Sequence, residues 1–352
     1  MHAWLLAPDN FTPPSRTPWG GTAIASRYKR DLGLDPRTVV GESWEVSAGD
    51  EFPSRVAGTN EALAEVLARD PARHLGDEAP AGNTALLVKL LDAADNLSVQ
   101  IHPSDDYAGL SEGECGKPES WYVLDAAPGA GLYLGLAEHA TNERVRDALA
   151  ADGDVAAMLG FVPVAPGDFF VVEAGTAHAI GRGVTLVEPQ IVRPGRRGVT
   201  YRYWDWNRRY DPQGNASPTG SPRALHVAHA LAVTAWDAPR GGAFLQRARV
   251  RAGAADLAGP FTLTALCARE GAALASGHLE VSRVAGTGSL TLPASGRLRA
   301  VTVVEGALHV DGDGATVTAT RGRSAVIAAR ADVTLRGDGV HAVVASVTSP
   351  RG

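Results

Sequence analysis

The chain has 352 residues, more than one hydrophobic core usually supports, and this length predicts two or three packed units. Its 33 Lys and Arg residues against 39 Asp and Glu residues give a net charge of -6, which argues against nucleic acid or an anionic membrane as a partner. Two cysteines are too few for a disulfide framework or a four-thiolate zinc site. The start lacks a signal-peptide pattern and no apolar run reaches the roughly 18 residues of a membrane span, so we expect a cytoplasmic protein.

Short apolar runs rich in β-branched residues, each bounded by Gly, Pro or Asp, predict a mainly β protein. Most gaps between these runs are short, which favours a barrel or jelly roll over alternating strands and helices. In chain order, the strands expected in the first part cover residues 85–91, 97–102, 120–125, 131–136, 168–173 and 183–188.

Two stretches interrupt the strands of the first part. Residues 60–75 and 142–159 place apolar side chains at intervals of three and four, a spacing typical of amphipathic helices. We expect each stretch to form a short helical insertion.

The composition changes after a connector at residues 238–242, where the chain becomes poor in aromatic residues and rich in Ala, Val, Thr and Gly. Residues 298–310 and 314–326 then alternate like half-buried antiparallel strands. We therefore predict an N-terminal domain over 1–237 and a second β-domain over 243–352.

Four residues of the first part form a possible metal site. Gln100 and His102 lie two apart on an expected strand, so both side chains leave the same face. Glu119 begins a later strand, and His178 follows a tight turn. Taken singly, each has a plain structural explanation, but together these nitrogen and oxygen ligands suit a cation such as zinc and leave room for a substrate oxygen.

The segment from Gly167 to His178 reads G-x5-E-A-G-x-x-H and is similar to the second motif of the cupin family, in which a hairpin presents a metal-binding histidine. The chain has Glu173 where cupins usually have proline and Arg182 where they usually have asparagine. This resemblance implies a cupin-like double β-barrel or jelly roll with a few short helices.

A closer resemblance comes from eight ordered blocks spread over about 190 residues, which match the order seen in type I phosphomannose isomerases. These blocks are WGG at 19, GESWEVS at 41, LVKLLD at 87, LSVQIHP at 97, GKPESWY at 116, PGDFF at 166, AGTAHAIGRG at 174 and TYRYWDW at 200. The resemblance implies a protein that interconverts mannose 6-phosphate and fructose 6-phosphate at one zinc ion per chain.

The same resemblance assigns roles to individual residues. It makes Gln100, His102, Glu119 and His178 the metal ligands and Arg202 the catalytic arginine. It also puts Glu188 and Lys117 at catalytic positions and Lys89 at a substrate-binding position.

One spacing departs from the family pattern. The family usually places an acidic residue ten positions before the arginine, whereas Glu188 and Arg202 are 14 apart here. Either the intervening loop bulges and both residues keep their places, or only Arg202 is retained. Arg196 and Arg197 in this loop could meet a phosphate or could be solvated.

The chemistry of such an isomerisation demands a cation beside the developing enediolate, for which Arg202 is suited because it does not titrate. Glu188, Lys117 or a metal-bound water could move the proton. The structural alternative for Arg202 is an ion pair with Asp205, and the alternative for Lys89 is an edge strand with its amine in water.

Two other functions fit the same residues. A sugar-binding cupin could retain the metal and sense hexose phosphates without turning them over. An iron-dependent oxygenase would prefer two histidines and a carboxylate, without Gln100.

The second β-domain is predicted to hold no metal. When Gly322 is aligned with Gly167, the position that corresponds to His178 is Val333. His278 and His309 each have an acidic residue two positions later, but no second ligand motif follows, so we expect both at the surface and this domain in a structural role.

Overall fold

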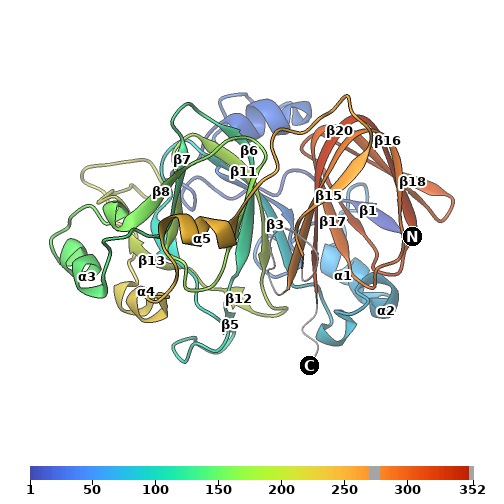
Figure 1. Ribbon diagram of the computed structural model, residues 1–352. Helices are drawn as coiled ribbons and strands as arrows, with labels where there is room; N and C mark the ends of the chain where they lie inside the picture. Colours follow the sequence, from blue (N-terminus) through green and yellow to red (C-terminus); the bar gives the residue numbers. More distant parts are fainter. Residues whose placement is uncertain (269–277, 349–352) are drawn as a thin grey trace.

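The computed structural model describes residues 1–268 and 278–348. Its strands form two β-rich halves that lie side by side (Figure 1). The middle of the chain, teal to yellow-green, builds one half, and the last part, orange to red, builds the other. The expectation of a mainly β protein is therefore confirmed.

The first half consists of two facing sheets. A five-stranded sheet has the order β13-β4-β10-β7-β8, and a six-stranded sheet has the order β14-β9-β6-β11-β3-β2. A buried apolar cluster that includes Leu132 and Ile180 from one sheet and Trp121 and Phe170 from the other fills the space between them. The strands are β2 (Glu42–Val46), β3 (Leu86–Ala93), β4 (Val99–Ile101), β6 (Glu119–Ala126), β7 (Gly131–Leu136), β8 (Leu159–Pro163), β9 (Asp168–Val172), β10 (His178–Ile180), β11 (Val184–Ile191), β13 (Tyr201–Trp204) and β14 (Arg249–Arg251). A small parallel pair joins β5 (Glu114–Cys115) to β12 (Arg197–Gly198).

The second half is one seven-stranded antiparallel sheet with the path β1-β19-β17-β20-β16-β15, and β18 pairs with β17. Bulges bend its long strands, as at Gly286 and Gly288, whose φ angles of 109° and 132° favour glycine. Its strands are β1 (Ala3–Leu5), β15 (Thr262–Cys267), β16 (Leu279–Leu292), β17 (Arg299–Gly312), β18 (Ala315–Thr320), β19 (Ser324–Ile327) and β20 (Val333–Val347).

Short helices lie around these sheets. Among the described helices, none combines the length and apolar character that a membrane crossing needs. They are α1 (Leu63–Ala68), α2 (Pro71–His74), α3 (Asn142–Ala150), α4 (Val227–Val233) and α5 (Gly241–Ala248), with single turns η1 (Ile24–Tyr28), η2 (Arg30–Leu32), η3 (Ala79–Ala81) and η4 (Ala156–Met158).

The predicted helices were correct in place but too long. In 60–75 the chain forms α1 and α2, and Asp70 caps α2 by accepting the Arg73 N–H at 3.1 Å. In 142–159 the helix ends at Ala150, and Leu159 already belongs to β8. Asp152, with φ 49°, ends the helical path after α3.

Two other boundaries also differ from the sequence analysis. The run 314–326 is two strands, because a turn at Gly322, with φ 72°, separates β18 from β19. The predicted connector at 238–242 already contains the start of α5. Two strands also cross the predicted domain limits: β1 pairs with β19, and β14 pairs with β9. The division at 237 and 243 stays a prediction.

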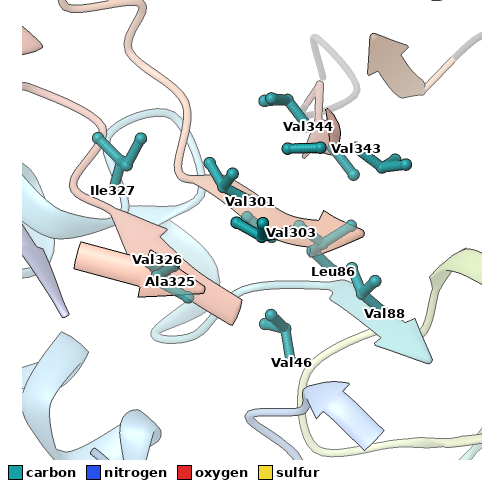
Figure 2. Close-up of a cluster of buried hydrophobic side chains, with 14 of the residues drawn as sticks. Val46, Leu86, Val88, Val301, Val303, Ala325, Val326, Ile327, Val343 and Val344 are labelled. Carbon is teal, nitrogen blue, oxygen red and sulfur yellow. The ribbon is translucent and has the colours of Figure 1, made fainter. Parts of the chain in front are cut away.

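The two halves meet at an apolar interface on one face of the six-stranded sheet. Figure 2 shows Val46, Leu86 and Val88 of the first half close to Val303 and Val343 of the second. Because side chains alternate along a strand, the opposite face of β3 presents Leu87, Lys89 and Leu91 to the interior of the first half. The second half thus packs against the back of this sheet, and its purely structural role stays a prediction.

A buried polar group also joins the halves. Lys29 Nζ lies 2.6 Å from Glu45 Oε1, and the two side chains are 1% and 2% exposed. Ser43 of β2 and Ser324 of β19 donate hydrogen bonds of 2.7 and 2.8 Å to the two oxygens of Glu45. Glu45 therefore links β2 to the second half on the face opposite to Glu42 and Trp44.

Candidate active site

One row of side chains crosses the five-stranded sheet. Gln100 of β4 lies directly opposite His178 of β10 on one side and opposite Arg202 of β13 on the other. His102 follows the end of β4, and its carbonyl accepts the Gly175 N–H at 2.9 Å, which joins it to the turn before His178. The pairing of three strands thus gathers residues that lie up to a hundred positions apart.

Glu119 comes from the facing sheet. It begins β6, where it lies opposite Val172 and Gln190 in the strands on either side. Its side chain is fully buried and reaches both histidines: Oε2 lies 3.2 Å from His102 Nε2, and Oε1 lies 3.3 Å from His178 Nε2. The two sheets therefore meet at this carboxylate.

Backbone carbonyls orient both imidazoles. His102 Nδ1 donates to the Val199 carbonyl at 3.0 Å, and His178 Nδ1 donates to the Thr176 carbonyl at 2.8 Å. Burial lowers the pKa of His102, and it lowers the pKa of His178 to about 3. Both rings are therefore neutral and direct the Nε2 lone pair toward Glu119, which is the form that binds a metal.

The geometry fits one metal ion. Ligand atoms of His102, Glu119 and His178 all lie within 4.8 Å of one another. Two ligands of a tetrahedral zinc ion at about 2.1 Å lie roughly 3.4 Å apart, close to the spacing of these nitrogens and oxygens. Among the described residues, His102 Nε2 and Glu119 Oε1 are buried polar atoms without a hydrogen-bond partner. A cation between them would satisfy both.

Gln100 lies at the same centre but presents its amide nitrogen, which is 3.4 Å from His178 Nε2. Its Oε1 accepts a hydrogen bond from Ser98 Oγ at 3.3 Å. Half a turn of the amide group would bring the oxygen toward the histidine and make Gln100 a fourth ligand.

Glu119 keeps its charge in this buried position. Burial alone would raise the pKa of Glu119, but Lys117 and the two histidines outweigh it and hold the pKa well below its usual range. Lys117 Nζ lies 3.2 Å from Oε2, and Gln190 Nε2 donates to the same oxygen at 2.7 Å. Burial would lower the pKa of Lys117, yet Glu119 and other carboxylates raise it, so this amine holds its proton.

A second row crosses the six-stranded sheet, where Lys89 of β3 lies opposite Glu188 of β11 and Trp44 of β2. The ammonium lies 4.6 Å from the Trp44 ring centre, 3.6 Å from Glu42 Oε1 and 3.7 Å from Glu188 Oε2. Because β3 lies between two other strands, the edge-strand alternative for Lys89 is wrong.

Glu188 is buried beside this lysine. Its Oε1 accepts the Trp121 indole N–H at 3.0 Å. Burial, followed by the charge of Glu119, raises the pKa of Glu188 to about 8. A carboxyl group with a pKa near neutrality can both take up and release a proton.

Arg202 has no carboxylate partner among the described residues. Its Nε donates to Ser98 Oγ at 3.1 Å, and one terminal nitrogen donates to the Ala224 carbonyl at 2.9 Å. The ion pair with Asp205 that the sequence left open does not form, because Asp205 binds Arg208 and Arg223 instead. Burial lowers the pKa of Arg202 to about 10, which leaves it charged at neutral pH.

A cavity of about 780 Å³ opens between the two sheets, beside this centre. Gln100, Lys117, Glu188, Lys89 and Arg202 all line it. The loop between Glu188 and Arg202 also lines this cavity, for example with Pro194 and Arg196. This geometry favours the first of the two alternatives for the loop, which stays a prediction.

Two residues of the site were missed in the sequence. Gln190 lies on the same face of β11 as Glu188, two positions further on, and this spacing could have identified it. His226 lines the cavity beside Arg202, accepts the Arg202 N–H on Nδ1 at 3.2 Å and donates its own backbone N–H to the Arg202 carbonyl at 2.8 Å. No pattern near His226 indicated this contact.

The histidines of the second half lie outside this site. His278 is exposed, as expected, while His309 is half-buried and contacts Thr318 Oγ1 at 2.9 Å. His341 Nε2 lies 3.0 Å from the hydroxyl of Tyr122 in the first half. In the part of the chain that the structure describes, the only cluster of three or more metal-binding side chains is that of His102, Glu119 and His178.

Comparisons with known proteins give a consistent result. Residues 15–122 match the family model described as phosphomannose isomerase type I, catalytic domain. The chain is 37% identical over 220 residues to a mannose-6-phosphate isomerase of Streptococcus mutans, which covers 61% of this chain and 63% of that protein. It is 35% identical over 218 residues to one from Bacillus subtilis, with 61% and 64% covered. These alignments span just under two thirds of the relatives' length.

The fold extends the likeness to the whole chain. The crystal structure of the mannose 6-phosphate isomerase from Bacillus subtilis matches with a TM-score of 0.76 at 25% identity, over 98% of this chain and 99% of that one. A structure described as zinc-bound mannose 6-phosphate isomerase matches with a TM-score of 0.68 at 16% identity, over 98% and 100%. The cupin-like architecture expected from the sequence agrees with these structures.

Proposed function

We propose that this chain belongs to the type I phosphomannose isomerase family and interconverts mannose 6-phosphate and fructose 6-phosphate at one divalent metal ion. The observation that carries the proposal is the meeting of His102, Glu119 and His178. Gln100 and Lys117 contact this group, and they line one cavity together with Glu188 and Arg202. The proposed location is the cytoplasm, because a chain with only two cysteines suits a reducing compartment.

We assign the metal to His102, Glu119, His178 and Gln100, with zinc as the proposed ion. The neutral imidazoles, the ionised carboxylate and two unsatisfied buried ligand atoms support this assignment. A bound ion would supply a Lewis acid that polarises the substrate carbonyl and lowers the pKa of the adjacent hydroxyl.

Glu188 is the proposed proton-transfer group. Aldose–ketose isomerisation moves a proton between two adjacent carbons, so the group needs a free oxygen that faces the substrate. Glu188 lines the cavity, and its Oε1 accepts the Trp121 N–H. Among the described residues, no donor forms a hydrogen bond with its Oε2. Lys117 is a poorer base because Glu119 holds its ammonium at 3.2 Å. Its role in the proposal is to stabilise negative charge.

Arg202 and Lys89 complete the proposed machinery. Removal of the carbon-bound proton leaves negative charge on the substrate oxygens, and Arg202 offers a permanent cation without an internal carboxylate to compete for it. Lys89, held over Trp44 between two carboxylates, can donate hydrogen bonds to sugar hydroxyls.

The set of two histidines and one carboxylate on its own also suits an iron(II) oxygenase. The similarity to type I phosphomannose isomerases and the position of Gln100 favour the isomerase. The sensor alternative had rested on the changed spacing before Arg202, and it loses that support because Glu188 and Arg202 face the same cavity.

The test combines metal analysis with a coupled assay on one sample. The purified protein is expected to hold about one zinc per chain and to convert mannose 6-phosphate to fructose 6-phosphate. Prolonged chelation and desalting should abolish turnover, and zinc should restore it. Iron as the bound metal, or a metal-loaded protein that binds the sugar phosphate without turnover, would contradict the proposal.

A further inference from the structure

The cavity wall carries a strong excess of cations. Eight lysine and arginine side chains line it: Arg16, Lys89, Lys117, Arg193, Arg196, Arg197, Arg202 and Arg223. Six of them have carboxylate partners, which are Glu51 for Arg16, Glu42 and Glu188 for Lys89, Glu119 for Lys117, Asp105 for Arg193, Glu114 for Arg197 and Asp205 for Arg223. Two arginines remain whose charge no described carboxylate neutralises.

These two arginines lie on different elements. Arg202 is opposite Gln100 in the sheet and so belongs to the metal end of the cavity. Arg196 lies on the loop between β11 and β12, where it is exposed to solvent. The cavity thus offers one uncompensated cation beside the candidate metal centre and a second on the loop between β11 and β12.

The loop that carries Arg196 has a defined shape. The Arg196 N–H donates to the Arg193 carbonyl at 3.0 Å, which closes a four-residue turn. Pro194 fixes the second position of this turn, and Gly195 supplies the positive φ of 68° that a type II turn requires at the third. The sequence Arg-Pro-Gly-Arg therefore builds the turn that presents Arg196.

Both ends of the turn are tied to the body of the protein. Arg193 Nε donates to Asp105 at 2.7 Å, and Arg197 binds Glu114 while its strand pairs with β5. One terminal nitrogen of Arg196 donates to the Glu114 carbonyl at 3.0 Å, which orients the guanidinium and leaves its other donors available. Because the turn is anchored in this way, Arg196 would lose little conformational entropy when it binds a ligand.

We infer that Arg196 binds the phosphate group of the sugar phosphate substrate; this inference rests on the proposed function. A phosphate dianion prefers a planar guanidinium with two or more free donors, and Arg196 is the cation of the cavity wall that is neither neutralised nor next to the reacting end. The phosphate and the carbonyl are at opposite ends of a hexose phosphate, which is consistent with two uncompensated arginines that line one cavity from different elements.

The test compares Arg196→Ala, Arg196→Lys and wild type as metal-loaded enzymes, with Arg251→Ala as the control for loss of an exposed arginine outside the cavity. Removing a hydrogen-bonded charge pair should raise KM for mannose 6-phosphate about tenfold to a hundredfold. The turnover number should stay within about twofold, because Arg196 does not touch the reacting carbons. Arg196→Lys should recover part of the affinity.

Binding of inorganic phosphate, measured by calorimetry on the same samples, gives a readout that does not need turnover. Arg196→Ala should weaken phosphate binding by a similar factor, while Arg251→Ala should not. Unchanged KM and unchanged phosphate affinity in Arg196→Ala, with the melting temperature preserved, would overturn the inference. Arg196-dependent phosphate binding in a protein that fails to isomerise mannose 6-phosphate would support this site and refute the proposed function.

Discussion

Asp205 binds the guanidinium of Arg223 through two hydrogen bonds of 2.7 Å each. Arg208 binds the same carboxylate from its other side, with Nη2 at 2.6 Å from Oδ1. This arrangement occupies the acidic residue closest in sequence to Arg202, so the Arg202 charge stays available to a ligand. Arg202 is therefore a cation beside the candidate metal centre, because Arg208 and Arg223 take up the neighbouring carboxylate.

Arg202→Ala is expected to lower kcat by roughly 10² or more while the metal content stays unchanged, by analogy with the loss of one transition-state donor. Arg202→Lys should fail nearly as badly, because an ammonium cannot reproduce the planar fork that donates to Ser98 and Ala224. Metal content and turnover are measured on one sample, with Arg30→Ala as an exposed control. Near-normal turnover in zinc-loaded Arg202→Ala would make this arginine structural.

His102→Ala should lose most of the bound metal, because its Nε2 is one of the buried ligand atoms that only a cation satisfies. Elemental analysis of the purified variants checks this expectation against about one metal per chain in the wild type. His139→Ala, which removes an exposed histidine of the same half, is the matched control. A His102→Ala protein with a full complement of metal would remove this residue from the ligand set.

Glu188→Gln tests the proposed proton transfer. Glutamine keeps the size of the side chain and an oxygen that can accept the Trp121 N–H, but it cannot take up a proton. We expect kcat to fall by about 10² to 10⁴ with KM and metal content nearly unchanged. Glu173→Gln, at an exposed carboxylate outside the cavity, is the control. Retention of normal turnover would transfer the role to another group.

Local periodicity and motif order identified residues that the structure brings together, and their roles stay predictions. The two-residue spacing of Gln100 and His102 indicated a shared face, and both side chains indeed contact His178. The partners of the charged groups were not predictable, because Asp205 meets Arg223 across 18 residues through a loop without a periodic pattern. Likewise, apolar spacing could not separate the end of a helix from a buried strand at Leu159, since both periods fit so short a run.

The position of the N-terminal strand β1 could not be predicted, because it depends on contacts with residues far away in the sequence. Ala3 pairs with Ile327, more than 300 positions away, and nothing in the short run around it indicates that partner. The same limit applied to Lys89, because the sequence shows an apolar strand with one lysine but not the strands on either side of it. Their order is set by the whole sheet.

The buried pair of Lys29 and Glu45 is expected to contribute to folding. Lys29→Met leaves the Glu45 carboxylate without its cation at the junction of the two halves, so stability should fall by about 3 to 5 kcal/mol. The double variant Lys29→Met, Glu45→Leu should lose less than the two single changes combined, because it leaves no buried charge unpaired. Denaturant unfolding measures all four proteins. Additive losses would show that the two residues act independently.

Glu78 gives the protein a pH dependence outside the active site. Burial raises the pKa of Glu78 from 4.5 to about 7, although the Ala85 N–H and the Thr84 hydroxyl donate to its oxygens at 2.7 and 2.9 Å. The folded state therefore favours the neutral acid. The stability that this group contributes is complete below about pH 4.5, declines as pH rises, and is lost above about pH 7.

Glu78→Gln should abolish that contribution to the pH dependence. A difference of this size between the folded and the unfolded pKa corresponds to at most roughly 3 kcal/mol of unfolding free energy. As the pH rises from 5 to 8, the stability of the variant relative to wild type should therefore increase by about 2 to 3 kcal/mol. Urea unfolding at the two pH values measures the change, and comparing the variant with wild type cancels the titration of all other groups. Glu65→Gln, at an exposed carboxylate of α1, should follow the wild-type curve. Parallel stability curves for Glu78→Gln and wild type would mean that Glu78 titrates near its ordinary pKa in the folded protein.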